Sequence, residues 1–495
     1  MGNIRNTFYY QNNTLQQTKI LKKKLSEINA FEKYTMNDIG AAQMFSDMFH
    51  GECRFNATAC EWFHYDGKIW SIDKGGLFAR SAAKNLSRAL SSYAPDAADT
   101  DQDLRSYMEY AKKWTSARFR DVVVRDARDV YFFSNEEMER DDFMLNVQNG
   151  VLILHKDKID FIPHNADLLL SKICNASYNP NAKHDRWNQF IYEIMEGNEA
   201  KMSYLQKIFG LCLTGDTSVE KMWFLFGSTT RNGKSTLIES VAHALGTYAE
   251  NIRPETLAIK NNPDSRVASP DVAKLAAVRM VVCSEPPKRM ALDTGLIKNL
   301  TGRDTITARF LHQCEFSFIP KFKLLCNTNY LPVTTDMTIF SSGRIQIITF
   351  DKHFSEHEQD KTLKSKLQSD EAMSAILNWC IEGWLSFCKE GLEVPEAVQN
   401  ATQEYRCNSD KISNFIADCL EISNTNVSVK ESYTAYEKWC KENGFFVENK
   451  KNFIDELKSK GIFAERGMVK GKQTRNIIKG YDFAFSDIVE SVPFE

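Results

Sequence analysis

Four short, largely apolar runs in the middle of the chain predict strands that are buried on both faces. They are Trp223–Phe226, Arg279–Cys283, Lys323–Cys326 and Ile345–Phe350, and polar or turn-forming residues follow each of them. Apolar runs of this length, separated by helical patterns, are typical of a parallel sheet in an α/β fold. The pattern predicts an α/β core between about residues 216 and 400.

Helical periodicity surrounds this core. Apolar positions recur at helical spacing in residues 186–213, 237–245 and 357–389, and Gly246 ends the second of these segments. The third segment carries one apolar face and predicts a packed helical lid; the face consists of Ile376, Trp379, Cys380, Trp384 and Phe387.

Two hairpins are predicted ahead of the core. Residues 61–70 alternate aromatic side chains around Asp66-Gly67, and residues 143–154 place two strand-like runs around Asn149-Gly150. We therefore expect a small α+β section over residues 1–85 and a mainly helical domain over residues 86–215.

The last residues, 405–495, have the pattern of a separate unit. Helical stretches at 411–422, 430–443 and 450–460 precede an alternating strand-turn-strand segment at 461–478. Three helices followed by a wing predict a winged-helix domain. The segment between Asn449 and Gly480 contains nine Lys or Arg residues and only three acids. We therefore expect DNA contacts from wing residues. The candidates are Lys470, Lys472 and Arg475.

The composition mainly excludes some classes of protein and some kinds of site. The 495-residue chain is 43% hydrophobic and 26% charged with a net charge of −3, so any DNA contact must come from local patches. Its 12 Cys and 9 His show no zinc-like spacing, which predicts reduced thiols and no Cys/His metal site. No apolar run reaches membrane-spanning length and no signal peptide is recognised. We expect a soluble cytoplasmic protein without membrane partners.

Residues 227–236 read Gly-Ser-Thr-Thr-Arg-Asn-Gly-Lys-Ser-Thr and follow the first predicted strand. Such a loop wraps phosphate oxygens with backbone N–H groups, while Lys234 reaches the outer phosphates and Ser235 holds Mg²⁺. Five residues lie between Gly227 and Gly233, one more than in the simple P-loop pattern, which puts Ser228 at the first-glycine position. The pattern predicts ATP and Mg²⁺ as cofactors, bound through Ser228, Asn232, Gly233, Lys234, Ser235 and Thr236.

Polar residues near the other strands complete a candidate catalytic set. Glu285 follows the second strand, where an acid polarises the attacking water and shares Mg²⁺; the alternative is a surface acid ahead of a Pro-Pro turn. Asn329 follows the third strand and could sense the γ-phosphate. Arg344 precedes the fourth strand and is a candidate arginine finger for a neighbouring subunit, which would imply a ring.

A basic strand-tip-strand segment lies between the second and third strands. Residues 305–318 predict a hairpin with its tip at His312-Gln313, a shape suited to gripping a phosphate backbone. The cationic candidates in and around it are Lys298, Arg303, Arg309, His312, Lys321 and Lys323. Each lysine taken singly is more often a plain surface charge.

The acids Asp99, Asp101 and Asp103 admit two interpretations. Paired acids of this kind can hold metal ions in primases. They stand just before a predicted helix, however, and N-terminal capping is the interpretation that we favour.

The order of these motifs resembles superfamily 3 helicases, specifically the phage, plasmid and poxvirus primase-helicase family. The segments that carry the resemblance are Asn232–Thr236, Glu285, Ile297–Arg309, Asn329–Pro332 and Arg344–Phe350. The resemblance implies an AAA+-like P-loop ATPase fold, Glu285 in catalysis, Asn329 as sensor and Arg344 as finger. It also implies that the hairpin follows DNA through a ring. The lengthened loop and Gly343, where relatives often carry a second Arg, depart from the family pattern.

Our first hypothesis is an ATP-driven replicative helicase of a phage or mobile element. It would form a homo-oligomer, expected to be a hexamer, on single-stranded or forked DNA, with a separate primase as a further partner. The alternative is an ATP-controlled initiator or loader, or the helicase component of a primase-helicase. Few residues precede the predicted helical domain, which argues against a primase domain in this chain, and the finger and wing elements argue against a small-molecule kinase.

Overall fold

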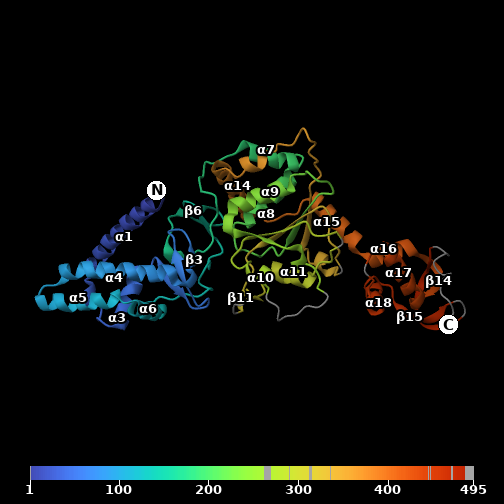
Figure 1. The fold of residues 1–495 in the computed structure, drawn as a ribbon. Coiled ribbons are helices and arrows are strands. Elements are labelled where there is room, and N and C mark those ends of the chain that lie inside the picture. The colour runs from blue at the N-terminus through green and yellow to red at the C-terminus, as the bar shows by residue number, and fades with distance from the viewer. Residues whose placement is uncertain are drawn as a thin grey trace.

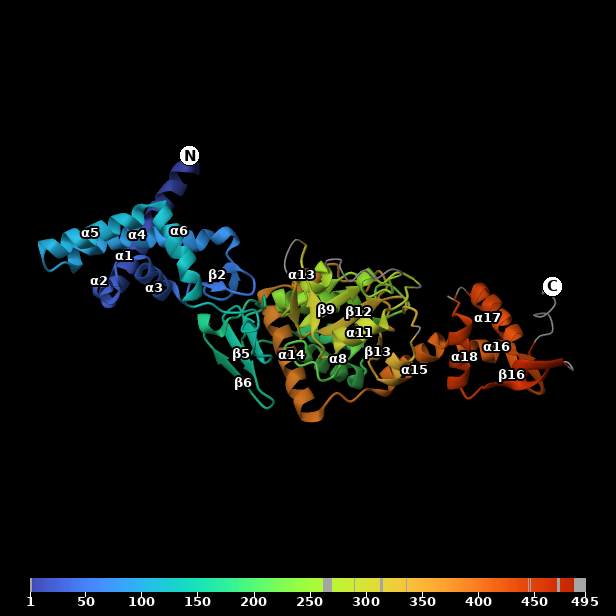
Figure 2. The same cartoon turned by 90° about the horizontal axis from the view of Figure 1, so that it is seen from below.

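The computed structural model describes residues 2–260, 269–288, 290–311, 315–334, 336–443, 445, 447–469 and 472–484. The molecule is elongated, with the N-terminal and C-terminal units on opposite sides of a central α/β unit (Figures 1 and 2). Each unit encloses its own apolar core.

The N-terminal unit packs helices around a small antiparallel sheet of order β1-β2-β3. Leu86, Leu90 and Trp114 are fully buried in its core. The hairpin predicted at 61–70 is confirmed, because β2 and β3 pair with Tyr65 opposite Trp70. The elements are α1 (Gly2–Glu27), α2 (Ala30–Lys33), α3 (Asp38–Phe49), β1 (Cys53–Asn56), β2 (Glu61–Tyr65), β3 (Trp70–Ile72), α4 (Leu77–Ala97), α5 (Asp101–Thr115) and α6 (Ala117–Asp126).

The predicted boundary between residues 85 and 86 falls inside α4. Buried alanines and leucines along the whole of α4 join one core, so the chain on both sides of residue 85 belongs to the same unit. Helical periodicity alone does not reveal this, since the pattern of a helix does not show what its apolar face contacts.

Of the three acids at the start of α5, Asp103 takes part in the N-terminal cap, as predicted. The hydroxyl of Thr100 accepts a hydrogen bond from the Asp103 N–H, and the Asp103 carboxylate accepts one from the Thr100 N–H. This reciprocal pair is a capping box. Within the described ranges no group of His, Cys, Asp or Glu side chains is arranged to hold a metal ion.

A second small sheet and two helices lie against the central unit. The predicted hairpin at 143–154 is confirmed, because Val147 pairs with Gly150 across a two-residue turn. The buried side chains of this region share the core of the central unit. The elements are β4 (Met144–Val147), β5 (Gly150–Leu154), β6 (Ile159–Ile162), α7 (Asp185–Ile194) and α8 (Glu199–Leu211).

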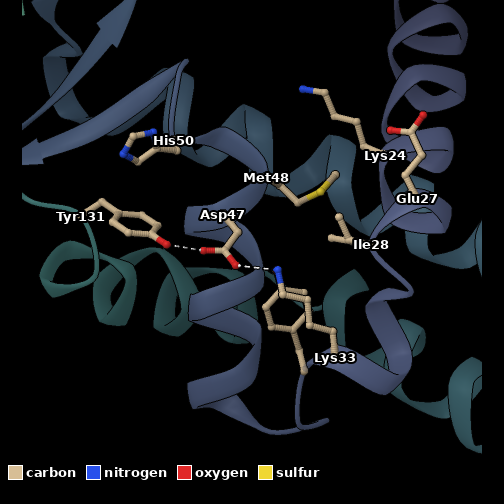
Figure 3. A pocket seen from close by; sticks show the side chains of 9 residues that line it. Lys24, Glu27, Ile28, Lys33, Asp47, Met48, His50 and Tyr131 are labelled. Atoms are coloured by element: carbon tan, nitrogen blue, oxygen red, sulfur yellow. Dashed lines mark hydrogen bonds and ion pairs between the residues drawn. The ribbon is translucent and has the colours of Figure 1, made fainter. Parts of the chain in front are cut away.

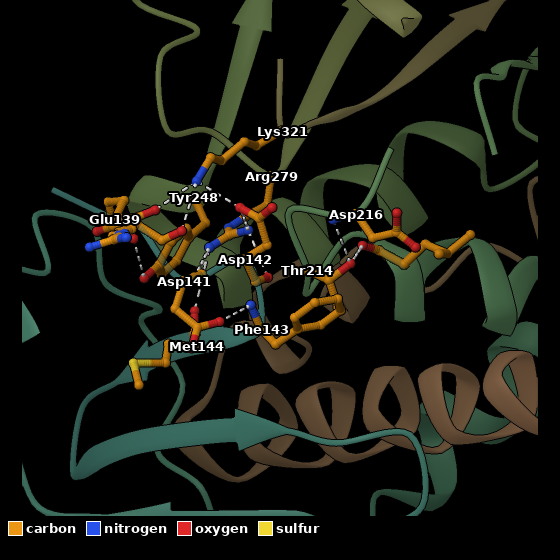
Figure 4. A network of polar contacts seen from close by, with 12 residues as sticks. Glu139, Asp141, Asp142, Phe143, Met144, Thr214, Asp216, Tyr248, Arg279 and Lys321 are labelled. Carbon is orange, nitrogen blue, oxygen red and sulfur yellow. Dashed lines mark hydrogen bonds and ion pairs between the residues drawn. The ribbon is translucent and has the colours of Figure 1, made fainter. Parts of the chain in front are cut away.

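A buried polar network fixes the segment before β4 to the central sheet (Figure 4). The fully buried Arg279 donates a hydrogen bond to the backbone oxygen of Asp142 at 2.8 Å. Lys321 forms an ion pair of 2.6 Å with the Asp142 carboxylate and donates to the backbone oxygen of Glu139 at 2.7 Å. Tyr248 donates to the Glu139 carboxylate at 3.3 Å. Buried charges are costly unless they are paired or hydrogen-bonded. These contacts therefore favour one arrangement of the segment before β4 against the central sheet.

The central unit is built on a five-stranded parallel sheet of order β13-β7-β12-β9-β8. Side chains alternate between its faces: Trp223 and Leu225 enter the core that α8, α9 and α14 cover, whereas Phe224 enters the core on the other face. The predicted α/β class and the parallel sheet are confirmed. The strands are β7 (Met222–Phe226), β8 (Ala249–Ile252), β9 (Met280–Ser284), β12 (Lys323–Thr328) and β13 (Ile345–Thr349).

The predicted lid is α14, which crosses α8 at very close range. A Cβ added at Gly210 would lie 2.2 Å from the backbone nitrogen of Trp384, and one added at Gly383 would lie 2.1 Å from the Gln206 oxygen. Glycine at both positions is what lets the two helices meet. The helices of the unit are α9 (Lys234–Leu245), α10 (Pro270–Ala273), α11 (Thr294–Thr301), α12 (Thr338–Ser341), α13 (Leu363–Lys366), α14 (Asp370–Glu390) and α15 (Glu396–Ser409).

The C-terminal unit packs three helices against an antiparallel sheet of order β14-β16-β15. Phe415, Tyr436 and Phe453 are buried at its centre. Its elements are α16 (Lys411–Cys419), β14 (Leu420–Ser428), α17 (Val429–Asn443), α18 (Lys450–Ser459), β15 (Ala464–Val469) and β16 (Lys472–Phe483). No helix in the described part of the chain is both long enough and apolar enough to cross a membrane.

Candidate active site

Lys234 is the first residue of α9 and lies directly behind the loop that leaves β7. Its ammonium donates hydrogen bonds to the Gly227 oxygen at 3.3 Å and to Oδ1 of Asn329 at 2.9 Å. The residue is only 3% exposed. The loop, the start of α9 and the end of β12 therefore meet at the carboxyl edge of the sheet, where ligands bind in open α/β folds.

Gly227 is the glycine that the loop requires. A Cβ at this position would lie 2.2 Å from Nδ2 of Asn232 and 2.8 Å from the Lys234 ammonium. Ser228, which the motif count placed at the first-glycine position, has an exposed side chain. The assignment of Ser228 stays a prediction, and Gly227 is the position at which the folded loop leaves no room for a side chain.

The lengthened loop is held by contacts on both sides. Within it, Asn232 donates to the Thr229 oxygen at 2.7 Å. From the segment after β13, the Phe354 N–H donates to the oxygen of Arg231 at 2.9 Å, and Nδ1 of His353 lies 2.8 Å from the Thr230 oxygen. Arg231 has a φ of 58°, a left-handed conformation that bends the loop at the additional residue.

The electrostatics of Lys234 suit an anionic ligand. Burial lowers its pKa to about 8, while the nearby Glu285 carboxylate acts in the opposite direction. No carboxylate in the described ranges forms an ion pair with this ammonium, and its two recorded acceptors are neutral oxygens. A buried cation with neutral partners is stabilised by incoming negative charge, which phosphate oxygens supply.

Ser235 contacts a residue that sequence analysis missed. Nδ2 of Asn327 donates to Oγ of Ser235 at 3.0 Å, and Asn327 is 6% exposed. The signal in the sequence was an amide within the apolar strand 323–328. Its significance depends on a contact across 92 residues of chain, which the linear pattern does not show.

Glu285 leaves β9 beside this group. Its N–H donates to the backbone oxygen of Asn327 at 2.8 Å, and its φ of 52° is unusual for a residue with a side chain. The residue is exposed. A carboxylate and the Ser235 hydroxyl at one strand edge are ligands that Mg²⁺ accepts together with phosphate oxygens. The chemistry of the site therefore fits Mg²⁺ bound with a nucleotide.

Arg344 lies at the other end of the sheet. It directly precedes β13, and its backbone oxygen accepts a hydrogen bond from Met222 at the start of β7. The length of one strand, roughly 16 Å at about 3.3 Å per residue, separates it from the loop that follows β7. Its guanidinium forms an ion pair of 2.8 Å with Glu220 and donates to the Thr301 hydroxyl at 3.0 Å. Arg344 does not join the site of its own chain.

The predicted DNA-contacting cations fall into separate environments. Lys323 is buried within β12, where burial lowers its pKa to about 7 and its amine donates to the Thr214 oxygen at 2.6 Å, so its assignment to DNA is wrong. Lys321 is held in the junction of Figure 4, which corrects its assignment too. Lys298 and Arg303 are ion-paired with Asp336 and Asp216 respectively.

The remaining candidates lie at the hairpin and the C-terminal unit. The predicted hairpin is β10 (Ile306–Ala308) paired with β11 (Phe316–Phe318), and Arg309 follows β10. Lys472 and Arg475 are exposed on β16. His312 and Lys470 lie outside the described residues.

One open pocket of about 560 Å³ lies in the N-terminal unit, away from this edge (Figure 3). Lys24, Asp47 and Tyr131 are among its lining residues. The Asp47 carboxylate accepts hydrogen bonds from Tyr34 at 2.6 Å and from Tyr131 at 2.8 Å. These hydrogen bonds join α3, which carries Asp47, to the residue after α2 and to the segment after α6. The structure therefore gives Asp47 a packing role.

Comparison with known proteins covers most of the chain. Residues 42–196 match the model described as "D5 N terminal like", residues 225–344 match "Family of unknown function (DUF5906)", and residues 408–486 match "Poxvirus D5 protein-like". Two of these three models are D5 models, so the chain is similar to D5-type proteins over residues 42–196 and 408–486.

Relatives of this D5-type chain are viral. "Putative helicase L207/L206" of Acanthamoeba polyphaga mimivirus is 28% identical over 67% of the chain and 37% of that protein. "Primase D5" of fowlpox virus is 25% identical over 53% of the chain and 32% of that protein. The chain thus spans about a third of the length of these two relatives. The solved apo structure of the NrS-1 C terminal region (305–718) aligns with 67% of the chain and 94% of its own, at 11% identity and a TM-score of 0.38.

Proposed function

We propose that this D5-type chain is an ATP-driven motor of DNA replication that works as a ring of subunits. The observation that carries the proposal is the convergence of Lys234, Ser235, Glu285 and Asn329 on one strand edge, with a buried ammonium that lacks a carboxylate partner among the described residues. This convergence supports an AAA+-like P-loop site, and the names of the viral relatives agree with a helicase or primase role.

Each residue of the set has a role in ATP hydrolysis. Lys234 and the loop N–H groups would hold the phosphates, and Ser235 and Glu285 would hold Mg²⁺, which neutralises the charge that develops on them. Glu285 would polarise the attacking water. Asn329, already hydrogen-bonded to Lys234, would orient that water and respond to the γ-phosphate.

Arg344 supports the ring. It lies a strand's length from the site of its own chain, so it can act as an arginine finger only on ATP held by a neighbour. Consecutive subunits would then meet through the carboxyl edge of one sheet and the Arg344 end of the next. A closed ring of six subunits satisfies every site in this head-to-tail manner.

DNA would contact two parts of the chain. The β10–β11 hairpin carries Arg309 next to the stacked rings of Phe310 and Phe316, whose centroids are 6.0 Å apart. The C-terminal unit has the helix and strand order of a winged helix, with Lys472 and Arg475 exposed on the wing strand. Single-stranded or forked DNA in a central channel is the proposed substrate, and a primase on a separate chain is the proposed partner.

A second candidate function is an ATP-controlled initiator or loader. The separate core of the C-terminal unit favours it, because DNA binding by this unit does not require a moving hairpin. The two candidates differ in turnover, since a loader needs only ATP binding and slow hydrolysis. A phage or mobile-element origin has no support in the viral relatives and is not part of the proposal.

ATP hydrolysis by the purified chain, with and without single-stranded DNA, tests the proposal. We expect DNA to stimulate turnover and Glu285→Gln to abolish it while ATP binding persists. Binding without stimulated turnover would favour the loader. Absence of nucleotide binding would remove both candidates.

A further inference from the structure

Asn327 lies where the phosphate-loop serine needs a partner. P-loop ATPases commonly place an aspartate at a strand end to hold the Ser/Thr hydroxyl and Mg²⁺. In this chain the residue before Glu285 is Ser284, whose side chain is exposed at the end of β9. The residue paired with Ser284 on the neighbouring strand is Asn327, and its amide reaches Oγ of Ser235 at 3.0 Å.

The surroundings of Asn327 show that the contact is specific. Its neighbours Leu325 and Cys326 are fully buried apolar side chains, and Asn327 itself is 6% exposed. An amide placed there is destabilising unless it forms hydrogen bonds. Within the described ranges, the recorded side-chain hydrogen bond of Asn327 is the one to Ser235.

Asn327 lies in β12, and Asn329 follows the last residue of that strand. Both amides contact the start of α9. Asn329 contacts Lys234, and Asn327 contacts Ser235, the next residue. The pair holds the phosphate-binding and metal-binding side chains of the loop in place before any ligand is present, and such preorganisation is what a binding site requires.

We propose that Asn327 is a positioning residue for Mg²⁺ that replaces the usual aspartate from the neighbouring strand. This inference rests on the proposed ATP site. An amide offers a donor or, after a half-turn about χ2, an acceptor at the same place. It can therefore orient the Ser235 hydroxyl in the free site by donating to its oxygen, and accept a hydrogen bond from the Ser235 O–H when the serine oxygen faces the metal. It does so without adding negative charge beside Glu285.

The test measures nucleotide and metal binding rather than hydrolysis. The full-length chain is titrated with a fluorescent, non-hydrolysable ATP analogue, first in EDTA and then with increasing Mg²⁺. In Asn327→Leu we expect the Mg²⁺ concentration at the midpoint to rise at least about tenfold, as for other outer-shell metal partners, while binding in EDTA changes less than about twofold.

Two further variants separate a contact from a general loss of structure. Asn327→Asp keeps the shape and supplies an acceptor, so its Mg²⁺ midpoint should stay within about threefold of wild type. Asn251→Ala removes an exposed amide from β8 of the same sheet and should leave both titrations unchanged. Should Asn327→Leu not fold, as judged by its thermal transition, the smaller Asn327→Ser carries the same expectation.

The outcomes distinguish this inference from the proposed function. An unchanged Mg²⁺ midpoint in the folded variant, or an equal loss of binding with and without Mg²⁺, would overturn the role of Asn327 alone. If the wild-type chain binds no analogue under either condition, the ATP site itself is wrong.

Discussion

The Lys234 ammonium donates a hydrogen bond to Oδ1 of Asn329, 2.9 Å away, and so joins the first residue of α9 to the residue that follows β12. The two positions are 95 residues apart in the chain. Because both lie at the carboxyl edge of the parallel sheet, a ligand that displaces either partner acts on both elements at once.

ATP binding should take up protons in alkaline solution. The pKa of Lys234 is lowered to about 8 by burial, and phosphate charge favours the protonated amine. Below pH 8 the free amine is already protonated, so uptake is small; above it, affinity falls by up to about tenfold per pH unit. Calorimetry in two buffers of different ionisation enthalpy measures this uptake.

Lys234→Met is the control for that titration. It should fold, bind ATP weakly and show no linked proton, and Lys234→Ala should likewise lose ATPase activity and unwinding. Affinity in the wild-type chain that does not change between about pH 7 and pH 9.5 would contradict the assignment of the linked proton to this amine.

Gly227→Ala should weaken ATP binding strongly, although it adds only one methyl group. The added Cβ would collide with Asn232 and with the Lys234 ammonium, so ATP affinity should fall at least about tenfold, or 1.4 kcal/mol. Gly51→Ala is the matched control, because a Cβ there meets nothing within 4 Å. Equal ATP affinities in the two variants would show that the loop accommodates a side chain at Gly227.

Arg344→Ala should bind ATP normally and fail to hydrolyse it. Since Arg344 and Lys234 lie at opposite ends of the sheet, mixing Arg344→Ala with Lys234→Ala subunits rebuilds intact sites at some interfaces. For random mixing in equal amounts, about a quarter of the interfaces regain both groups. ATPase activity of the mixture tests this, and Glu220→Gln serves as a control that keeps Arg344 but removes its ion pair.

No recovery in the mixture, with the rings intact by size, would place the finger elsewhere. An unchanged rate in Arg344→Ala alone would lead to the same conclusion.

Removal of the chain after Asn408 should weaken DNA binding more than basal ATPase activity. Within the intact chain, the double variant Lys472→Gln and Arg475→Gln should reduce the slope of log affinity against log salt by about 1.4 to 1.8, if each residue neutralises one phosphate. Lys389→Gln, exposed on α14, is the matched control. Fluorescence anisotropy with labelled DNA measures the slope, and a slope equal to that of the control would exclude a wing contact.

The α/β class, the parallel strands and the hairpins at residues 61–70, 143–154 and 305–318 could all be predicted from the sequence alone. These features are local: apolar runs, turn residues and glycines act on neighbours within a few residues, so their signal survives in the linear pattern. The capping of α5 by Asp103 was predictable for the same reason.

Which side chains meet depends on how distant parts of the chain fold together. The contact between Asn327 and Ser235, the burial of Lys323 and the anchoring of Lys321 all join residues 92 to 182 positions apart. The membership of α4 in the first core was likewise settled by packing. The sequence does not show whether a basic side chain faces solvent or a buried carbonyl oxygen. Burial depends on the order of strands in the sheet, which the linear pattern does not contain. That order brought β12 between β7 and β9 and so assembled the site.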